Sequence, residues 1–488
     1  MSRIIARWGG LAAAALLAFS AAPAFAGEPD LAAMQAQLDQ MKADYEARIA
    51  ALEARIARDE ARNGQAPADA GAPADAADAA AADPAMATAA NPDETDQPPD
   101  QDSGQPVEVA ANDSAAEAPS DEPVDGATAQ PNAMNPGVSV VLNGNYVINS
   151  RDPARQRIPG FELGDEAGQP DRGFSLAESE LTFAANVDPF FAAQLTVAFD
   201  GQGEAGVEEA FIQTTALPGG LTAKAGRFFS GVGYLNERHA HNWSFIDMPL
   251  PYRAFLGGQY GDDGVELRWI APVDIFLEFG AEAYRGDSFP AGGAANQGAG
   301  TYTAFVHAGA DINDSWSWLA GLSYLHARAD GRETTDPVSG VDAFSGDTDL
   351  GIVSGVLKWA PNGNVIQSNL VLSAEYFMNR EDGAFNGVAT QLDRSGWYGQ
   401  AVYQFMPHFS VGLRYAQLHG DEPGPLLLGT TIDPAGNPWS ASALFEYDSS
   451  EFGRFRAEYT RDESDLQSAD EFWLQYTVVY GPHAAHRY

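Results

Sequence analysis

From about residue 137 to the C-terminus, the chain consists of short segments in which apolar and polar residues alternate, separated by turns. In the last segment the residues on one face are all apolar: Phe472, Leu474, Tyr476, Val478 and Tyr480. Strands with this two-residue period can close into a barrel, the only β architecture that crosses a lipid bilayer with every backbone group paired. The pattern therefore predicts an all-β protein, a transmembrane antiparallel β-barrel.

We expect about sixteen strands, an even number as in other single-chain bacterial barrels. They lie near residues 138–149, 173–187, 190–200, 207–216, 221–232, 263–270, 274–285, 300–309, 315–327, 348–359, 364–379, 395–406, 408–418, 440–448, 452–462 and 470–480. Tight turns rich in Gly, Pro, Asn and Asp alternate with longer polar connections near 150–172, 233–262, 286–299, 328–347, 380–394 and 419–439. This alternation predicts tight turns on the periplasmic side of an outer membrane and long loops outside.

The alternation also assigns each side chain to a face of the barrel. Apolar residues must face lipid, because a charge at the bilayer midplane costs on the order of 2–4 kcal/mol. The charged residues that the pattern then assigns to a lumen are Glu178, Glu180, Glu209, Lys224, Glu278, Glu282, Glu375, Arg414, Arg454, Arg456 and Glu458. A sixteen-stranded lumen is wide enough to hold water, and an excess of acidic side chains favours cations.

The N-terminus indicates export and a separate tail. Arg3 and Arg7 precede an apolar run that ends in small residues, the order of a secretory signal peptide, so residues 1–26 are predicted to be cleaved. Residues 63–136 contain no Lys or Arg and are dominated by Ala, Pro, Asp and Glu, which predicts a disordered acidic linker. The barrel, residues 137–488, is then expected in the outer membrane of a Gram-negative bacterium, in contact with lipid and lipopolysaccharide.

Residues 27–62 carry a helical apolar stripe. Its members recur at spacings of three and four: Leu31, Met34, Leu38, Met41, Tyr45, Ile49, Leu52 and Ile56. A narrow stripe on an otherwise polar helix indicates a periplasmic coiled coil, and a homotrimer is expected because many porin barrels are trimers. The alternative is a single amphipathic helix that contacts the cell wall, another periplasmic component or a membrane surface.

Composition excludes some partners. The formal net charge of −41 makes nucleic acid an unlikely partner. The chain has no cysteine, so disulfides and thiolate metal sites are absent. We expect no cofactor.

Part of the barrel sequence resembles the phosphate-selective porin O/P family. The resemblance rests on residues 177–183 (AESELTF), 187–191 (VDPFF), 207–212 (VEEAFI) and 217–228 (LPGGLTAKAGRF). It implies a sixteen-stranded, usually trimeric, water-filled channel. Phosphate selection in that family depends on a ladder of basic residues, whereas Lys224 and Lys358 are the only lysines in this barrel. The resemblance therefore implies the fold and a role as a porin, but not phosphate specificity.

The connection after the fifth expected strand, residues 234–262, has unusual chemistry. By the resemblance to general porins, a loop in this third external position folds into the lumen and forms the constriction. The residues expected there are His239, His241, Trp243, Asp247, Tyr252 and Arg253. Two imidazoles two positions apart in an extended segment point the same way, so His239 and His241 could bind a divalent transition metal such as zinc if a carboxylate lies nearby. A second histidine pair, His483 and His486, lies near the chain end.

The sequence thus favours a porin for passive diffusion of small hydrophilic solutes or ions, and leaves two alternatives. One is a zinc-responsive or divalent-cation channel or binding protein that uses the loop histidines. The other is a structural anchor with a periplasmic coiled coil. We expect no enzymatic activity, since no G-x-S-x-G motif is present and the closeness of Ser244 to His241 in the sequence does not by itself indicate a catalytic triad.

Overall fold

The computed structural model describes residues 136–164, 167–201, 203–293, 298–337, 340–420, 426–427, 430–431 and 437–481. The expected signal peptide, coiled coil and linker, and the pair His483 and His486, lie outside these residues.

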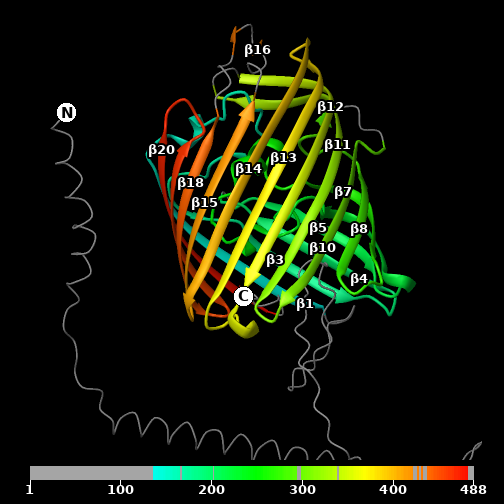
Figure 1. Cartoon of the computed structure of the whole chain (residues 1–488). Coiled ribbons are helices and arrows are strands. Elements are labelled where there is room, and N and C mark those ends of the chain that lie inside the picture. The colour runs from blue at the N-terminus through cyan, green and yellow to red at the C-terminus, as the bar shows by residue number, and fades with distance from the viewer. Residues whose placement is uncertain are drawn as a thin grey trace, which may run out of the picture. The chain divides into compact units, whose positions relative to one another are not determined.

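The described residues form a closed antiparallel barrel of sixteen strands (Figure 1). In order around the ring these are β1 (Gly137–Asn149), β3 (Ser179–Asn186), β4 (Phe191–Phe199), β5 (Ala205–Thr214), β6 (Leu221–Phe229), β7 (Gly261–Ile270), β8 (Phe276–Tyr284), β10 (Thr301–Asn313), β11 (Trp316–Asp336), β12 (Gly340–Trp359), β13 (Asn369–Phe385), β14 (Val388–Met406), β15 (Phe409–Gly420), β18 (Trp439–Ser450), β19 (Gly453–Glu463) and β20 (Ala469–Tyr480). The ring closes where β20 pairs with β1, from Val140–Tyr480 to Asn149–Glu471. The predicted strand number and antiparallel barrel are confirmed.

Four short strands and five short helices complete the described structure. They are β2 (Gly173–Leu176), β9 (Gly292–Gly293), β16 (Leu426–Leu427), β17 (Thr430–Thr431), η1 (Pro153–Arg155), η3 (Pro218–Gly220), η4 (Ala240–Asn242), α3 (Leu250–Phe255) and η5 (Pro361–Gly363). Strand β2 pairs with β1 just before β3 does, so β2 and β3 are one wall strand with a break between them.

Two of the predicted long loops are wrong. Residues 328–347 continue β11 and β12 almost to their turn, and residues 380–394 continue β13 and β14 to a two-residue turn at Asn386 and Gly387. Both turn residues have positive φ, 48° and 77°, as a tight hairpin of this kind requires. The prediction ended these strands where the residues became polar, but backbone pairing does not need apolar side chains.

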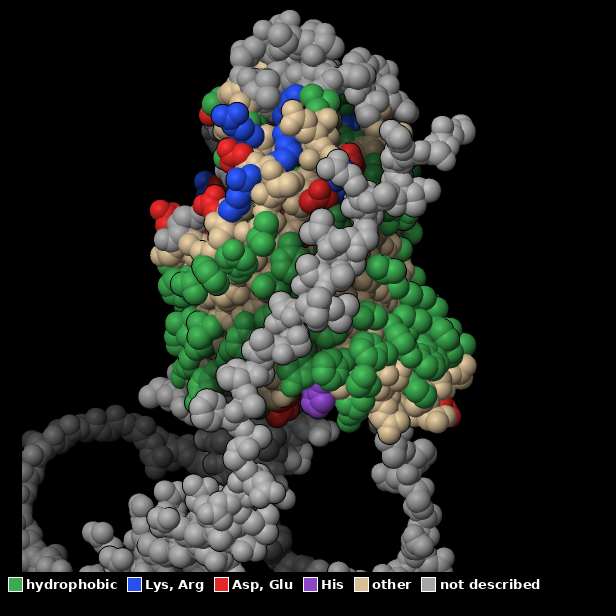
Figure 2. Space-filling model, turned by 90° about the vertical axis from the view of Figure 1, so that its left-hand side faces the viewer, with side chains coloured by type: hydrophobic (Ala, Val, Ile, Leu, Met, Phe, Trp, Pro, Cys, Tyr) green, Lys and Arg blue, Asp and Glu red, His purple; other side chains and the backbone are tan. Residues whose placement is uncertain are grey.

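The outer face of the barrel is hydrophobic. Exposed side chains include Leu195 on β4, Phe279 on β8, Tyr376 on β13 and Tyr476 on β20, all of which the alternation assigned to this face. Figure 2 shows that hydrophobic side chains gather in a broad belt, with Lys, Arg, Asp and Glu beyond one of its edges. Within the described residues, no helix is long and apolar enough to cross a membrane.

The inner face has two different sides. An apolar cluster contains wall residues such as Leu325 on β11, Ile352 on β12, Phe377 on β13 and Leu418 on β15. Among the described residues, this cluster has no member on β1, β3, β4, β18, β19 or β20, whose buried inward side chains are largely polar. The polar lining that the sequence predicted is therefore found on one side of the inner face, whereas the other side contributes residues to an apolar cluster.

Candidate functional site

A long segment inside the barrel organises this interior. We define the inner loop as residues 230–260, which connect β6 to β7 and contain η4 and α3. Helix α3 contacts β14 and β15, which lie far from β6 and β7 around the ring. The inner loop therefore crosses the interior and meets the opposite wall.

One set of bonds fixes α3 to the wall at β13 and β14. The Tyr252 hydroxyl donates a 2.9 Å hydrogen bond to Glu375, and the Tyr398 hydroxyl donates a 2.6 Å bond to the same oxygen. The Tyr234 backbone N–H donates to the other oxygen of Glu375 at 2.7 Å. Burial and the Glu375 charge raise the pKa of Tyr252 well above its ordinary value. The hydroxyl therefore stays protonated and remains a donor at neutral pH.

A second set of bonds fixes the middle of the inner loop to β15 and β19. Arg414 forms an ion pair with Asp247, and also lies 3.6 Å from Glu458. Glu458 accepts a 2.6 Å hydrogen bond from the Ile246 backbone N–H. Arg456 donates to the carbonyl oxygens of two loop residues, of which the contact to Ser244 measures 3.1 Å. Interior charges on these strands are thus occupied in positioning the loop.

The beginning of the inner loop is held by β7 and β8. Glu282 accepts hydrogen bonds from the Ser230 hydroxyl and, at 3.0 Å, from the Gly231 backbone N–H. Glu237 forms an ion pair with Arg268, which lies 2.8 Å from Glu266. Lys224, the lysine assigned to the lumen, lies 3.6 Å from Glu266. Basic side chains in this region are therefore already paired with carboxylates.

The connection between β1 and β2 also folds toward the inner loop. Its Phe161 ring packs edge to face on Phe255 of α3, with centroids 5.8 Å apart. Arg253 of α3 donates to the Ala167 carbonyl oxygen at 3.0 Å. Burial raises the pKa of Glu162 in this connection above its ordinary value, although its ion pair with Arg332 acts in the opposite direction. Part of this connection and residues near the β11–β12 turn line a cavity of about 340 Å³.

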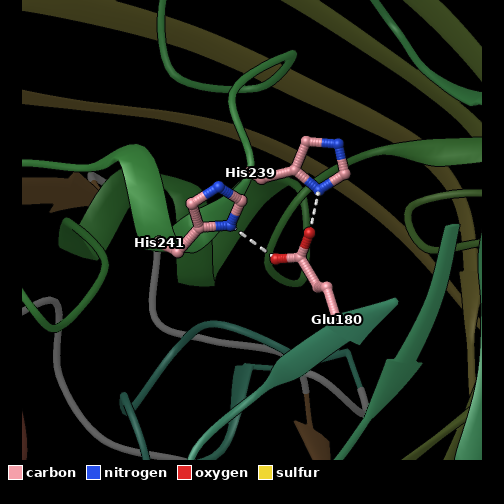
Figure 3. A group of neighbouring side chains, drawn as sticks. All are labelled: Glu180, His239 and His241. Carbon is pink, nitrogen blue, oxygen red and sulfur yellow. Dashed lines mark hydrogen bonds and ion pairs between the residues drawn. The ribbon is translucent and has the colours of Figure 1, made fainter. Parts of the chain in front are cut away.

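The two loop histidines meet a wall carboxylate. His241 Nδ1 lies 2.6 Å from Glu180 Oε1, and His239 Nδ1 lies 3.2 Å from Glu180 Oε2 (Figure 3). His239 Nδ1 is also 3.1 Å from Glu208, and its Nε2 is 3.1 Å from Glu209. We call Glu178, Glu180, Glu208, Glu209, His239 and His241 the histidine–glutamate cluster.

Two irregularities in the wall concentrate carboxylates in this cluster. Val141 pairs with Glu180 and Gly144 with Leu176, so β1 has one residue fewer than the opposite segment, which bulges around Glu178. On β5, consecutive β4 residues pair with Glu209 and Val207, which leaves Glu208 as the extra residue of a second bulge. A β-bulge re-aims side chains, and here adjacent glutamates, Glu208 and Glu209, both point inward.

The field of these carboxylates favours positive charge at His239. Burial lowers the pKa of His239, but Glu180 and Glu208 raise it, and the net pKa lies well above the ordinary histidine value. Both ring nitrogens face carboxylate oxygens, an arrangement that suits an imidazolium with two N–H donors. The cluster is therefore a place in the interior where a cation is stabilised.

The structure places every side chain that the sequence assigned to the lumen on the inner wall. Glu178 is half-buried and the other ten are buried. Of the residues expected at a constriction, His241, Trp243, Tyr252 and Arg253 are buried and position the inner loop, whereas His239 and Asp247 are partly accessible.

Sequence reasoning missed other interior charges. They include Glu208, Glu266, Arg268, Arg332, Glu381, Asp462 and Glu471. Arg268 shares the parity of Glu266 and could have been found from the alternation of β7. Glu208 could not have been found, because the alternation assigns it to the lipid face and only the bulge reverses it.

No protein-family model matches the chain. A protein of Aquifex aeolicus (strain VF5), described as uncharacterized, is 28% identical over 383 residues, which cover 72% of this chain and 80% of that protein. A loop L8 deletion mutant of OmpT, an outer membrane protein of Vibrio cholerae, has a TM-score of 0.47 at 12% identity and covers 70% of this chain and 98% of its own. An anion-selective porin from Comamonas acidovorans has a TM-score of 0.46 at 9% identity, with coverage of 70% and 98%. At these scores neither structure identifies the function.

Proposed function

We propose that the chain is an outer-membrane porin of a Gram-negative bacterium that forms a water-filled channel for passive diffusion of small hydrophilic solutes or ions. The observation that carries the proposal is the opposite chemistry of the two faces of one closed ring. Hydrophobic side chains cover its outside, while its inside carries many charged side chains. A closed ring leaves no strand edge unpaired in lipid, so this arrangement suits a bilayer.

The passage runs along the polar side of the interior, which is lined by β1, β3, β4, β18, β19 and β20, next to the part of the inner loop that precedes α3. Two observations support this position. The apolar cluster joins residues of the inner loop to residues of β11, β12, β13, β14 and β15. The partly accessible charged and histidine residues of the inner loop, Glu237, Arg238, His239 and Asp247, all precede helix α3, which is buried. These residues form the constriction.

The channel prefers cations to anions. Among the described residues, buried acidic side chains outnumber buried Lys and Arg side chains. The basic side chains that could attract anions, such as Lys224, Arg268 and Arg414, are each next to carboxylates. Phosphate selectivity is therefore not part of the proposal, in spite of the resemblance to the phosphate-selective family.

The proposal includes a homotrimer, contacts with lipopolysaccharide and a periplasmic coiled coil at residues 27–62. These features rest on the sequence pattern and on the resemblance, since residues 27–62 lie outside the described part of the chain. We propose no enzymatic activity.

Ion currents across a planar bilayer test the function. The purified protein should add stepwise conductance increments, and the reversal potential in a salt gradient should have the sign of a cation-preferring channel. Insertion without conductance would instead favour the alternative of a structural anchor.

A further inference from the structure

We propose that Glu180, His239 and His241 form a binding site for a divalent transition-metal ion such as zinc, at the point where the inner loop meets the wall. One ligand atom from each residue lies within 4.8 Å of the others. Glu180 is on β3, whereas the histidines flank the start of η4 in the inner loop (Figure 3). Binding itself is independent of the proposed porin function. Its effect on ion flow, described below, rests on that function.

The donor set is the one that zinc uses. Two imidazole nitrogens and one carboxylate oxygen are a common three-ligand set for zinc, with a fourth position left for water. With bonds of about 2.1 Å in a tetrahedron, neighbouring ligand atoms lie about 3.4 Å apart. His241 Nδ1 lies 2.6 Å from Oε1 of Glu180 and His239 Nδ1 lies 3.2 Å from Oε2, so the two histidines contact different oxygens of the carboxylate. Because one ligand atom of each residue lies within 4.8 Å of the others, side-chain movements of roughly 1–2 Å bring the three donors to the spacing that zinc requires.

The charge around these ligands also calls for a cation. Oxygens of Glu178, Glu180 and Glu208 lie within 4.8 Å of one another. Three carboxylates this close in a poorly solvated interior repel one another unless protons or cations compensate. One oxygen of Glu178 is buried and has no hydrogen-bond partner within the described residues. A divalent ion at Glu180 supplies this positive charge in place of the proton on His239, which the imidazole releases when it binds a metal.

The backbone is arranged to build this site. Without the bulge on β5, the alternation would turn Glu208 toward the lipid. The bulge before β3 reverses the alternation between β2 and β3, because Ser175 and Glu180 both pair with buried, inward-facing residues of β1. Bulges of this kind are common next to functional sites. Two of them on strands flanking the same two histidines indicate a site rather than an accidental contact.

The competing role is purely structural, with His239 and His241 as charged tethers of the inner loop. A binding measurement separates the two roles. Zinc chloride is titrated into the full-length protein in detergent by calorimetry, for the wild type, Glu180→Gln, His241→Ala and two control variants. His326→Ala removes an imidazole that also contacts a carboxylate, Asp349 at 2.9 Å, outside the cluster. The double variant His483→Ala and His486→Ala removes the pair at the chain end.

Saturable binding should weaken at least about 100-fold in Glu180→Gln and in His241→Ala, since loss of even an outer-shell partner costs 10–100-fold. Both control variants should bind as the wild type does. Heat-modifiable migration on gels shows that each variant is folded, and the conservative Glu180→Gln provides a second test if His241→Ala fails to fold. Absence of zinc binding in the wild type, or binding lost only with His483 and His486, overturns the proposal.

Single-channel conductance measures the effect of zinc binding on ion flow. Zinc should reduce single-channel conductance in the wild type and not in Glu180→Gln, because the ion neutralises carboxylates at the constriction. If zinc binds calorimetrically and no current is seen with or without it, the metal site stands and the porin function fails. If current is present and calorimetry shows no binding, the porin function stands and the metal site fails.

Discussion

Tyr252, on a short helix inside the barrel, donates a 2.9 Å hydrogen bond to Glu375 on β13, a residue 123 positions further along the chain. This bond joins the inner loop to the wall opposite the strands from which the loop departs. It shows how a loop is held across the interior instead of projecting from the end of the barrel.

Tyr252→Phe should destabilise the protein and loosen the inner loop. The variant loses the donor to Glu375 and the acceptor of the Leu235 backbone N–H, which lies 3.0 Å from the hydroxyl. A buried hydrogen bond to a charged group contributes about 1.5–3 kcal/mol, so the free energy of unfolding should fall by about 2 kcal/mol. Urea unfolding in detergent measures it. Tyr403→Phe, on the exposed outer face, is the matched control and should change stability by less than about 0.5 kcal/mol.

Arg414→Ala should be more damaging than Arg414→Ala combined with Glu458→Gln. The single variant leaves Asp247 and Glu458 without their shared cation, and removal of one partner of a buried pair costs about 3–5 kcal/mol. The double variant removes one of the two uncompensated charges. The same unfolding measurement tests this order of stabilities. Equal losses in the single and double variants would show that the charges do not interact.

Glu178→Gln combined with Glu208→Gln should shift the reversal potential in a salt gradient toward that of a less cation-selective channel. Both carboxylates belong to the histidine–glutamate cluster, where an acidic excess attracts cations. Asp393→Asn, in an exposed pair with Arg380 on the hairpin of β13 and β14, is the control and should leave selectivity unchanged. A shift only in the control variant would place the selectivity at the outer rim.

Single cysteines should show on which side of the interior the ions pass. The wild-type chain has no cysteine, so each introduced thiol is the only one. Thr182→Cys lies on the polar side, where the Thr182 hydroxyl is 3.2 Å from that of Thr196. A charged thiol reagent should reduce its conductance and leave Leu325→Cys, in the apolar cluster, unaffected. The reverse pattern would move the passage to the opposite wall.

Deletion of residues 27–62 should weaken the oligomer. The apolar stripe on this segment predicts a coiled coil, and its loss removes that interface. Light scattering after size-exclusion chromatography gives the oligomeric state in detergent. A deletion of similar length in the acidic tract, residues 63–98, is the control and should keep the wild-type state. If the first deletion also keeps it, subunit assembly does not depend on the stripe.

The sequence predicted the strands well because the two faces of a barrel wall require opposite chemistry. Alternation along β4, β8, β13 and β20 was enough to assign their side chains, including Glu375 and Phe279, to the correct face. It failed at the outer ends of β11 to β14, where pairing continues with polar residues on both faces. The alternation of apolar and polar residues shows which strand side chains contact lipid. The length of a hairpin depends instead on backbone pairing and on the turn residues, here Asn386 and Gly387.

The candidate site was only partly predictable. His239 and His241 were singled out by their spacing, but their partner Glu180 comes from a strand about sixty positions earlier, and no local pattern links them. Glu208 was assigned to the wrong face because a bulge is not visible in the alternation. No sequence pattern predicted that Trp243, Tyr252 and Arg253 are buried and hold the inner loop in place, because their burial depends on how the loop packs on distant strands.

Single-channel recording in a planar lipid bilayer tests the central claim most directly. The wild-type protein, reconstituted without zinc, should produce discrete conductance steps and a reversal potential that indicates cation preference. A bilayer that contains the folded, inserted protein and shows no conductance at any voltage would contradict the account, because the interior would then be closed to ions.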